Sequence, residues 1–191
     1  MKTFQHLVAL LAALACLAAP AVSAEGDPLV LRRQTLIVRD IERSLALYRD
    51  AIGMEVFYDE VIRRPRGEGQ PDQEIRLVFL KATDTYIGVL GLVDFQHDDP
   101  DHPDHSKPIR REGMTPGNAV VLFNTTELEA RWPRIVETPG VEVMRGPTLR
   151  EYPGYADQPP IRVMVTLFYD PDGFIVEFNQ PLDAIRPADS N

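Results

Sequence analysis

The pattern of apolar and polar residues predicts the same order of elements, β-α-β-β-β, in each half of the chain. In the first half, alternation over 31–38 predicts a strand, and apolar residues at helical spacing over 41–52 predict a helix with Asp40 as its N-cap and Gly53 at its end. Three further runs rich in branched and aromatic residues predict strands at 54–62, 74–81 and 86–93.

The second half repeats this order. A strand is predicted over 118–123, and Thr126 with Glu129 forms a capping box for a helix that Pro133 is expected to kink or shorten. Three more strands are predicted at 141–148, 161–169 and 174–179. Because either half has too few elements to cover both faces of its own sheet, we expect the halves to pack together.

This repeat predicts an α+β protein with two βαβββ modules. The modules span 25–96 and 117–182 and are expected to form a paired mixed β-sheet around a cleft. An acidic linker rich in His and Pro covers 97–116, and a tail covers 183–191.

One carboxylate interrupts the apolar pattern of the last predicted strand. The segment Asp170-Pro171-Asp172-Gly173 predicts a tight turn. Alternation after this turn separates two faces, with Phe174, Val176 and Phe178 on one and Ile175, Glu177 and Asn179 on the other. The role of Glu177 is therefore the main functional question.

The first 24 residues are typical of a secretory signal peptide. Lys2, the apolar run over 7–22 and the small residues that end at Ala24 fit this class, so we expect an exported, periplasmic protein. The single cysteine, Cys16, lies in this segment, which excludes disulfides and thiolate sites from the expected mature chain. Without Lys2, the expected mature chain has 19 of the 20 basic residues and all 29 acidic residues, which gives a net charge of −10. That charge argues against nucleic acid or an anionic membrane as a partner of the mature form.

Two segments, LIVRDIERSLALYRDAIGM (36–54) and DPDGFIVEF (170–178), carry a family resemblance. In a duplicated β-α-β-β-β chain they resemble the vicinal oxygen chelate superfamily, which includes glyoxalase I, bleomycin resistance proteins and extradiol dioxygenases. The resemblance covers about Leu31 to Gln180. Its motifs are specific for the fold and say little about which activity the fold hosts.

In metal-dependent members of that superfamily, four inward positions on the first and last strands of the two modules hold a divalent ion. The resemblance places these positions on Arg33, Val89, Asn118 and Glu177, and only Glu177 has an expected ligand. Because a catalytic metal generally needs about three protein ligands, we expect no metal cofactor in the cleft. The alternative is one divalent metal ion held by ligands at other positions.

Arg33 offers a replacement for the metal. A buried carboxylate needs a partner, and Arg33 could pair with Glu177 across the cleft while Asn118 adds a hydrogen bond. In one interpretation these residues only join the two halves. In the other, Arg33 binds an anionic oxygen of a small molecule and Glu177 acts as a catalytic base.

Further candidates lie in loops. Tyr152 and Tyr155 could stack on a ligand, although an ordinary Pro-Gly turn is the preferred interpretation. His97, His102 and His105, close to four aspartates, could form a weak surface metal site, although the prolines and missing apolar anchors favour a solvated loop.

The sequence therefore predicts a metal-independent binder of a small molecule. Its expected ligand-binding residues are Arg33, Val89, Asn118, Tyr152, Tyr155 and Glu177. The alternative is a glyoxalase-like lyase or isomerase, or a dioxygenase-like enzyme, with Glu177 and Arg33 as catalytic residues. A homodimer that exchanges halves is as compatible with the sequence as a monomer.

Overall fold

The computed structural model describes residues 29–154 and 158–185. The predicted signal peptide, Tyr155 and the last part of the predicted tail lie outside this range. Residues Leu31–Asn191 form one compact unit, separate from Met1–Val30. Among the described helices, none has the length and apolar character needed to cross a membrane.

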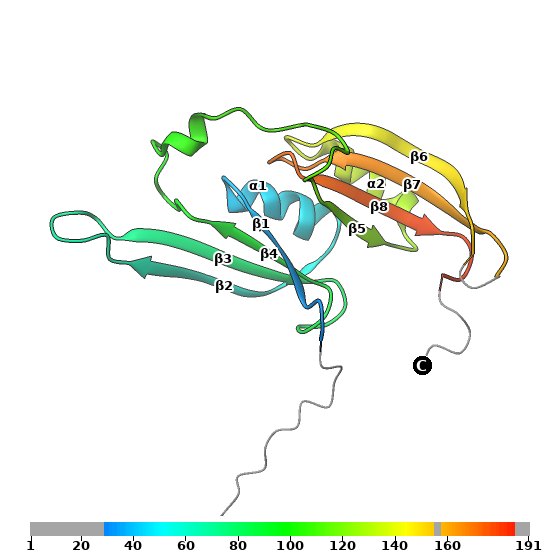
Figure 1. The fold of residues 1–191 in the computed structure, drawn as a ribbon, viewed down its shortest axis with the longest axis horizontal. Helices are drawn as coiled ribbons and strands as arrows, with labels where there is room; N and C mark the ends of the chain where they lie inside the picture. Colours follow the sequence, from blue (N-terminus) through cyan, green and yellow to red (C-terminus); the bar gives the residue numbers. More distant parts are fainter. Residues whose placement is uncertain (1–28, 155–157, 186–191) are drawn as a thin grey trace, which may run out of the picture. The chain divides into compact units, whose positions relative to one another are not determined.

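The first module is a mixed four-stranded sheet with one helix against it (Figure 1). Its strands are β1 (Arg33–Ile37), β2 (Glu55–Arg64), β3 (Gln73–Lys81) and β4 (Val89–Asp94). They lie in the order β1-β4-β3-β2, with β1 parallel to β4 and the other pairs antiparallel. Helix α1 (Ile41–Leu45) continues as a π-helix over Ala46–Ala51. The predicted N-cap is confirmed, because the Asp40 carboxylate accepts hydrogen bonds from the N–H groups of Glu42 and Arg43.

The second module repeats this topology. It consists of β5 (Val120–Asn124), α2 (Leu128–Glu137), β6 (Glu142–Tyr152), β7 (Ile161–Tyr169) and β8 (Ile175–Pro181), with the sheet order β5-β8-β7-β6. The predicted α+β fold with two βαβββ modules is confirmed. Gly53 and Gly140 lie between the helical segment and the next strand of their modules, where both adopt a φ of 91°. Equivalent positions of the two modules are therefore 87 residues apart there.

The predicted capping box at Thr126 and Glu129 is wrong. Helix α2 begins later, at Leu128. The N–H of Glu127 donates to the Thr125 hydroxyl, and the N–H of Leu128 donates to the side-chain oxygen of Gln180 on β8. Strand β8 therefore helps to fix the start of this helix, which sequence spacing alone did not reveal. Pro133 lies inside α2.

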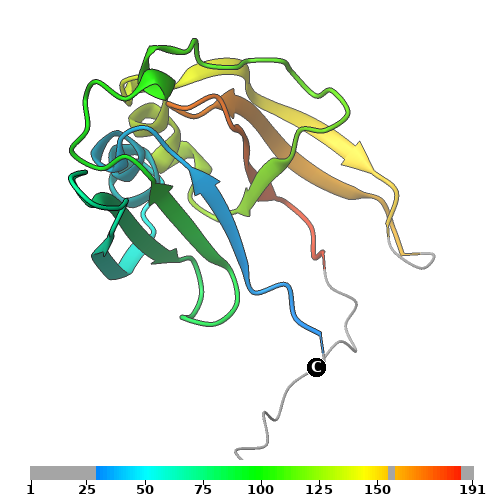
Figure 2. The ribbon, with the colours of Figure 1, turned by 60° about the vertical axis from the view of Figure 1, so that its left-hand side comes forward.

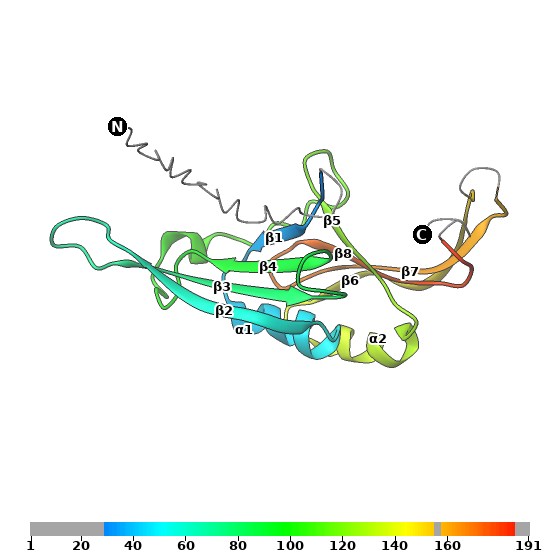
Figure 3. The ribbon, with the colours of Figure 1, turned by 90° about the horizontal axis from the view of Figure 1, so that it is seen from below.

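Both helices pack on the same side of the sheets (Figure 3). The core on that side includes Tyr48, Ile135 and Phe168, with Trp132 edge-on to Phe168. Val176 and Phe178 point into this core, which confirms the predicted alternation along β8. The opposite side is open at the edge strands, since Ile37 of β1 is 61% exposed and Leu122 of β5 is 55% exposed. On this side of the second sheet, Leu167, Tyr169 and Ile175 are buried.

The modules contact each other through buried polar groups. The Tyr48 hydroxyl donates to Asp170 Oδ2 at 2.9 Å, and the Arg131 guanidinium donates to the Ile52 carbonyl at 2.6 Å. The strands β1 and β5 are the edges of their sheets, and they face each other without backbone pairing (Figure 2).

Candidate functional site

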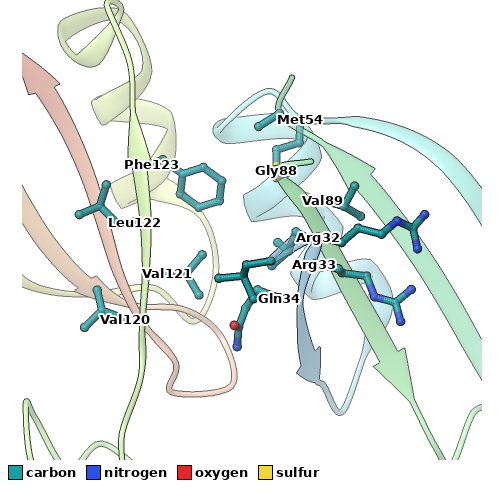
Figure 4. Close-up of a pocket in the computed structure, with 13 residues that line it drawn as sticks. Arg32, Arg33, Gln34, Met54, Gly88, Val89, Val120, Val121, Leu122 and Phe123 are labelled. Carbon is teal, nitrogen blue, oxygen red and sulfur yellow. The ribbon is translucent and has the colours of Figure 1, made fainter. Parts of the chain in front are cut away.

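A pocket lies between the edge strands β1 and β5 (Figure 4). Its volume is about 300 Å³. We call it the seam pocket, and its walls include Gln34, Met54, Leu90, Val121, Leu122 and Phe123. An apolar pocket with a few polar groups is the usual form of a small-molecule site.

Arg33 lines the seam pocket, but its guanidinium turns away from β5. Figure 4 shows the side chain extending across the sheet of the first module. There Cζ lies 4.3 Å from the centre of the Phe79 ring on β3. This is a cation–π contact, which leaves the N–H donors in the guanidinium plane available.

Glu177 lies on the open face of the second sheet. Its Oε2 accepts a hydrogen bond of 2.8 Å from Asn179 Nδ2. The Asn179 side-chain oxygen in turn accepts from the N–H of Thr166 on β7 at 3.0 Å. A neighbouring amide on the same strand therefore satisfies this carboxylate.

The predicted pairing of Arg33 with Glu177 is not formed. Within the described residues, no ion pair or hydrogen bond joins their side chains. The physical reason is that Arg33 on β1 and Glu177 on β8 belong to separate sheets, and each side chain finds a closer partner on its own sheet.

The strand registers also correct the assignment of equivalent positions. Thr35 is opposite Gly91, and Leu122 is opposite Glu177, so Gly91 rather than Val89 is the counterpart of Glu177. An offset of 87 residues makes Val120 rather than Asn118 the counterpart of Arg33. With either assignment, Glu177 is the single position of the four with a metal ligand.

Asn118 and Tyr152 lie apart from the seam pocket. The Asn118 side chain donates to the Gly113 carbonyl at 2.8 Å and stabilises the turn before β5. Tyr152 is the last residue of β6 and is 47% exposed. Val89 is buried opposite Arg33 and lines the seam pocket.

The three linker histidines do not form one site in the structure. Where residues are described, no group of three or more His, Cys, Asp or Glu side chains could hold a metal ion. His102 Nδ1 accepts from the N–H of Asp104 at the start of a 3₁₀ helix, Pro103–Ser106. His97 instead lies 3.7 Å from the carboxylate of Asp94, at the end of β4.

The Asp170-Pro171-Asp172-Gly173 turn contacts the first module. Burial raises the pKa of Asp170, although hydrogen bonds from Phe174 N–H and the Tyr48 hydroxyl oppose the shift. Burial and the charge of Asp170 raise the pKa of Asp172 to about 6, and Arg39 opposes this rise. This turn therefore holds two carboxyl groups that are costly to ionise, far along the chain from the tyrosine and arginine that bind them.

Sequence reasoning missed the surroundings of both site residues. Phe79 and Gly91 beside Arg33 became visible only through the strand registers. Asn179, which shares a strand face with Glu177 at a spacing of two, gave a local signal that could have been used.

Comparisons with known proteins agree with the fold. A family model described as Glyoxalase/Bleomycin resistance protein/Dioxygenase superfamily matches residues 30–178. No curated protein matches the chain.

Several solved structures are similar. A glyoxalase family protein from Bacillus cereus shares 14% identity with a TM-score of 0.53, over 84% of this chain and 99% of that one. A glyoxalase/dioxygenase from Nostoc punctiforme shares 19% identity with a TM-score of 0.53, over 85% and 98%. A glyoxalase I mutant from Zea mays shares 20% identity with a TM-score of 0.52, over 80% of this chain and 46% of that one. At these identities the likeness shows a shared fold and leaves the activity open.

Proposed function

The chain belongs to the Glyoxalase/Bleomycin resistance protein/Dioxygenase superfamily, and we propose that it is a metal-independent binder of a small molecule. One combined observation carries this proposal. The chain has a pocket of ligand size, and the residues at the four family positions are unsuited to binding a metal ion. The pocket walls are mostly apolar, with Gln34, Arg32 and Arg33 as their polar residues. Glu177 alone of the four family positions is a carboxylate. Such a site can hold a ligand by shape and burial without a cofactor.

A neutral apolar dye tests this proposal. We expect N-phenyl-1-naphthylamine to bind the chelator-treated protein with a rise in fluorescence. Ala82 is an exposed residue in the pocket wall, so the larger side chain of Ala82→Phe should fill the pocket. We expect the affinity for the dye to fall about tenfold or more, which corresponds to a loss of about 1.4 kcal/mol of binding free energy. Thr83→Phe adds the same ring to the next exposed residue, outside the wall, and should bind like the wild type.

Metal titration separates the alternative. The enzyme alternative has a metal-free form, a lyase or isomerase built on Arg33 and Glu177, and a metal-dependent form. A glyoxalase-like or dioxygenase-like enzyme of the second form would need one divalent ion, and Glu177 would be among its ligands. Stoichiometric binding of Ni²⁺, Zn²⁺ or Fe²⁺ that is lost in Glu177→Gln, together with dye binding that requires the metal, would overturn the proposal.

We also propose that the protein is exported to the periplasm, with a homodimer as the alternative to a monomer. Support for export comes from the signal-peptide pattern at 1–24. Support for a dimer comes from the open sheet faces, where Ile37 and Leu122 are exposed. Fractionation of the producing cells and sedimentation of the purified protein measure the two properties.

A further inference from the structure

A group of aromatic side chains lies on the open face of the first sheet, next to Arg33. We call Phe57, Tyr58 and Phe79, together with Arg33, the aromatic platform. The rings of Tyr58 and Phe79 are stacked with centres 4.8 Å apart, and Phe57 is tilted against Phe79 at 6.2 Å. Arg33 completes the group at 4.3 Å from the Phe79 ring centre.

An irregularity in β2 gathers these rings. The β2–β3 register shifts between Val56 and Tyr58, where the strand carries one residue that lacks a direct partner. Period-two alternation would send Phe57 and Tyr58 to opposite faces, yet both rings approach Phe79. A β-bulge of this kind re-aims side chains and is frequent beside functional sites.

Gly91 makes room for Arg33 to reach the platform. A Cβ atom at Gly91 would lie 3.2 Å from Arg33 Cδ, 3.1 Å from Thr35 Oγ1 and 3.5 Å from Phe79 Cδ1. The Arg33 side chain therefore crosses β4 directly over this glycine. At the equivalent position of the second module the chain has Glu177, so the two modules differ at the place where the arginine passes.

The guanidinium of Arg33 is not paired with an acid. Within the described residues no carboxylate lies within ion-pair distance of it, whereas nearby Lys81 on the same sheet is paired with Glu55 at 3.0 Å. Stacking on Phe79 occupies the face of the guanidinium, and its N–H groups lie in the plane. A carboxylate can accept two of these N–H groups at once.

We propose that the aromatic platform binds a planar aromatic carboxylate. Its ring covers the exposed edges of Tyr58 and Phe79, and its carboxylate accepts hydrogen bonds from Arg33. Two features lead to this choice. The positive charge of Arg33, on a chain that is acidic overall, is complementary to a carboxylate. The rings beside it would contact water if no ligand covered them. The inference rests on the proposed function as a small-molecule binder and adds the class of its ligand.

Titration calorimetry with three probes on the full, chelator-treated protein tests the chemistry. We expect 2-naphthoate to bind, and 2-naphthamide and cyclohexanecarboxylate to bind at least about tenfold more weakly, because each lacks one of the two features. Equal affinity for naphthamide would overturn the role of charge. Equal affinity for cyclohexanecarboxylate would overturn the role of the rings.

Three variants test the location. Arg33→Gln should weaken 2-naphthoate binding about tenfold to a hundredfold and leave the weak binding of 2-naphthamide unchanged. Gly91→Ala keeps the charge of Arg33 but displaces its side chain, so it should also weaken 2-naphthoate. The matched control is Arg32→Gln, because Arg32 lines the seam pocket as Arg33 does but lies over Tyr86 at 5.5 Å and not on the platform. An equal loss in Arg32→Gln would mean that the probe binds in the seam pocket or to general surface charge, and it would overturn the platform as the binding site.

The neutral dye separates this inference from the proposed function. If the dye binds in the seam pocket and 2-naphthoate does not bind, the aromatic platform is not a ligand site but the binder remains supported. If neither probe binds, both proposals fall. Circular dichroism and urea unfolding show whether each variant is folded, so a loss of binding cannot be mistaken for a loss of structure.

Discussion

At the scale of single residues, Thr166 is a buried polar residue of the second module whose hydroxyl makes two hydrogen bonds. Between the paired residues Met164–Gln180 and Phe168–Val176, its hydroxyl donates to the Phe178 carbonyl at 2.7 Å and accepts from the Phe178 N–H at 3.2 Å. Thr166 is completely buried. Its own N–H donates to Asn179, which in turn holds Glu177. The carboxylate on the open face is thus positioned by a buried network.

Valine has nearly the same volume as threonine, yet we expect Thr166→Val to destabilise the fold strongly. Valine leaves the buried N–H and carbonyl of Phe178 without their side-chain partner, and each unpaired group costs about 1–3 kcal/mol. The free energy of unfolding, measured with urea, should fall by about 2–4 kcal/mol. Thr166→Ser keeps the hydroxyl and loses only a methyl group, for a cost of about 1 kcal/mol. A serine variant less stable than the valine variant would contradict this account.

At the scale of elements, helix α2 completes the end of the helical segment in the first module. Arg131 donates to the Ile52 carbonyl, and Arg134 donates to the Asp50 carbonyl. The last carbonyl groups of a helix have no partner within it and carry a partial negative charge. Two arginines of the second module therefore donate hydrogen bonds to these carbonyl groups, and these bonds join the two modules.

Removal of these cations should loosen the first helical segment. We expect the double variant Arg131→Met, Arg134→Met to lower the free energy of unfolding by about 1–3 kcal/mol. Hydrogen exchange should speed up at the N–H groups of Ala46–Ala51. The control Arg49→Met breaks only an exposed pair with Asp50 and should cost about 1 kcal/mol or less. The contact would be unimportant if both variants exchanged alike.

The elements themselves could largely be predicted from the sequence, because they depend on local periodicity. Strand β7 spans the predicted residues, and the N-cap at Asp40 is confirmed. The start of α2 was missed because Gln180, which is distant in sequence, binds it. The Arg33–Glu177 pair failed for a related reason, because the space between two separate sheets and the room above Gly91 are tertiary properties.

At the scale of the whole molecule, we expect the turn at 170–173, which contacts the first module, to make the stability of the fold depend on pH. The carboxyl group of Asp172 lies 3.7 Å from Arg39 Nε and accepts a hydrogen bond from the Arg39 N–H. The Arg39 guanidinium also donates to the Lys107 carbonyl of the linker. Asp170 and Arg43 are the other charged groups that act on Asp172. One acid thus faces the first module and lies near the linker.

The raised pKa of Asp172, about 6, sets the sign of the pH dependence. Between about pH 4 and pH 6 the folded chain holds this proton more tightly than the unfolded chain, so the contribution of Asp172 to stability falls as pH rises through that window. Asp172→Asn removes the penalty and keeps an oxygen for the Arg39 N–H. We expect its gain in unfolding free energy over the wild type to be larger at pH 7.5 than at pH 4.5, by at most about 3 kcal/mol.

Urea unfolding followed by Trp132 fluorescence at the two pH values measures this difference. Asp84→Asn is the control, because the N–H groups of Ile87 and Tyr86 lower the pKa of that exposed carboxyl. A lowered pKa gives stability that is present above the unfolded pKa and is lost as pH falls, so this variant should show no gain at pH 7.5. An Asp172→Asn variant whose gain is the same at both pH values would mean that Asp172 ionises as easily in the folded chain as in the unfolded one, and that the turn joins the modules without sensing pH.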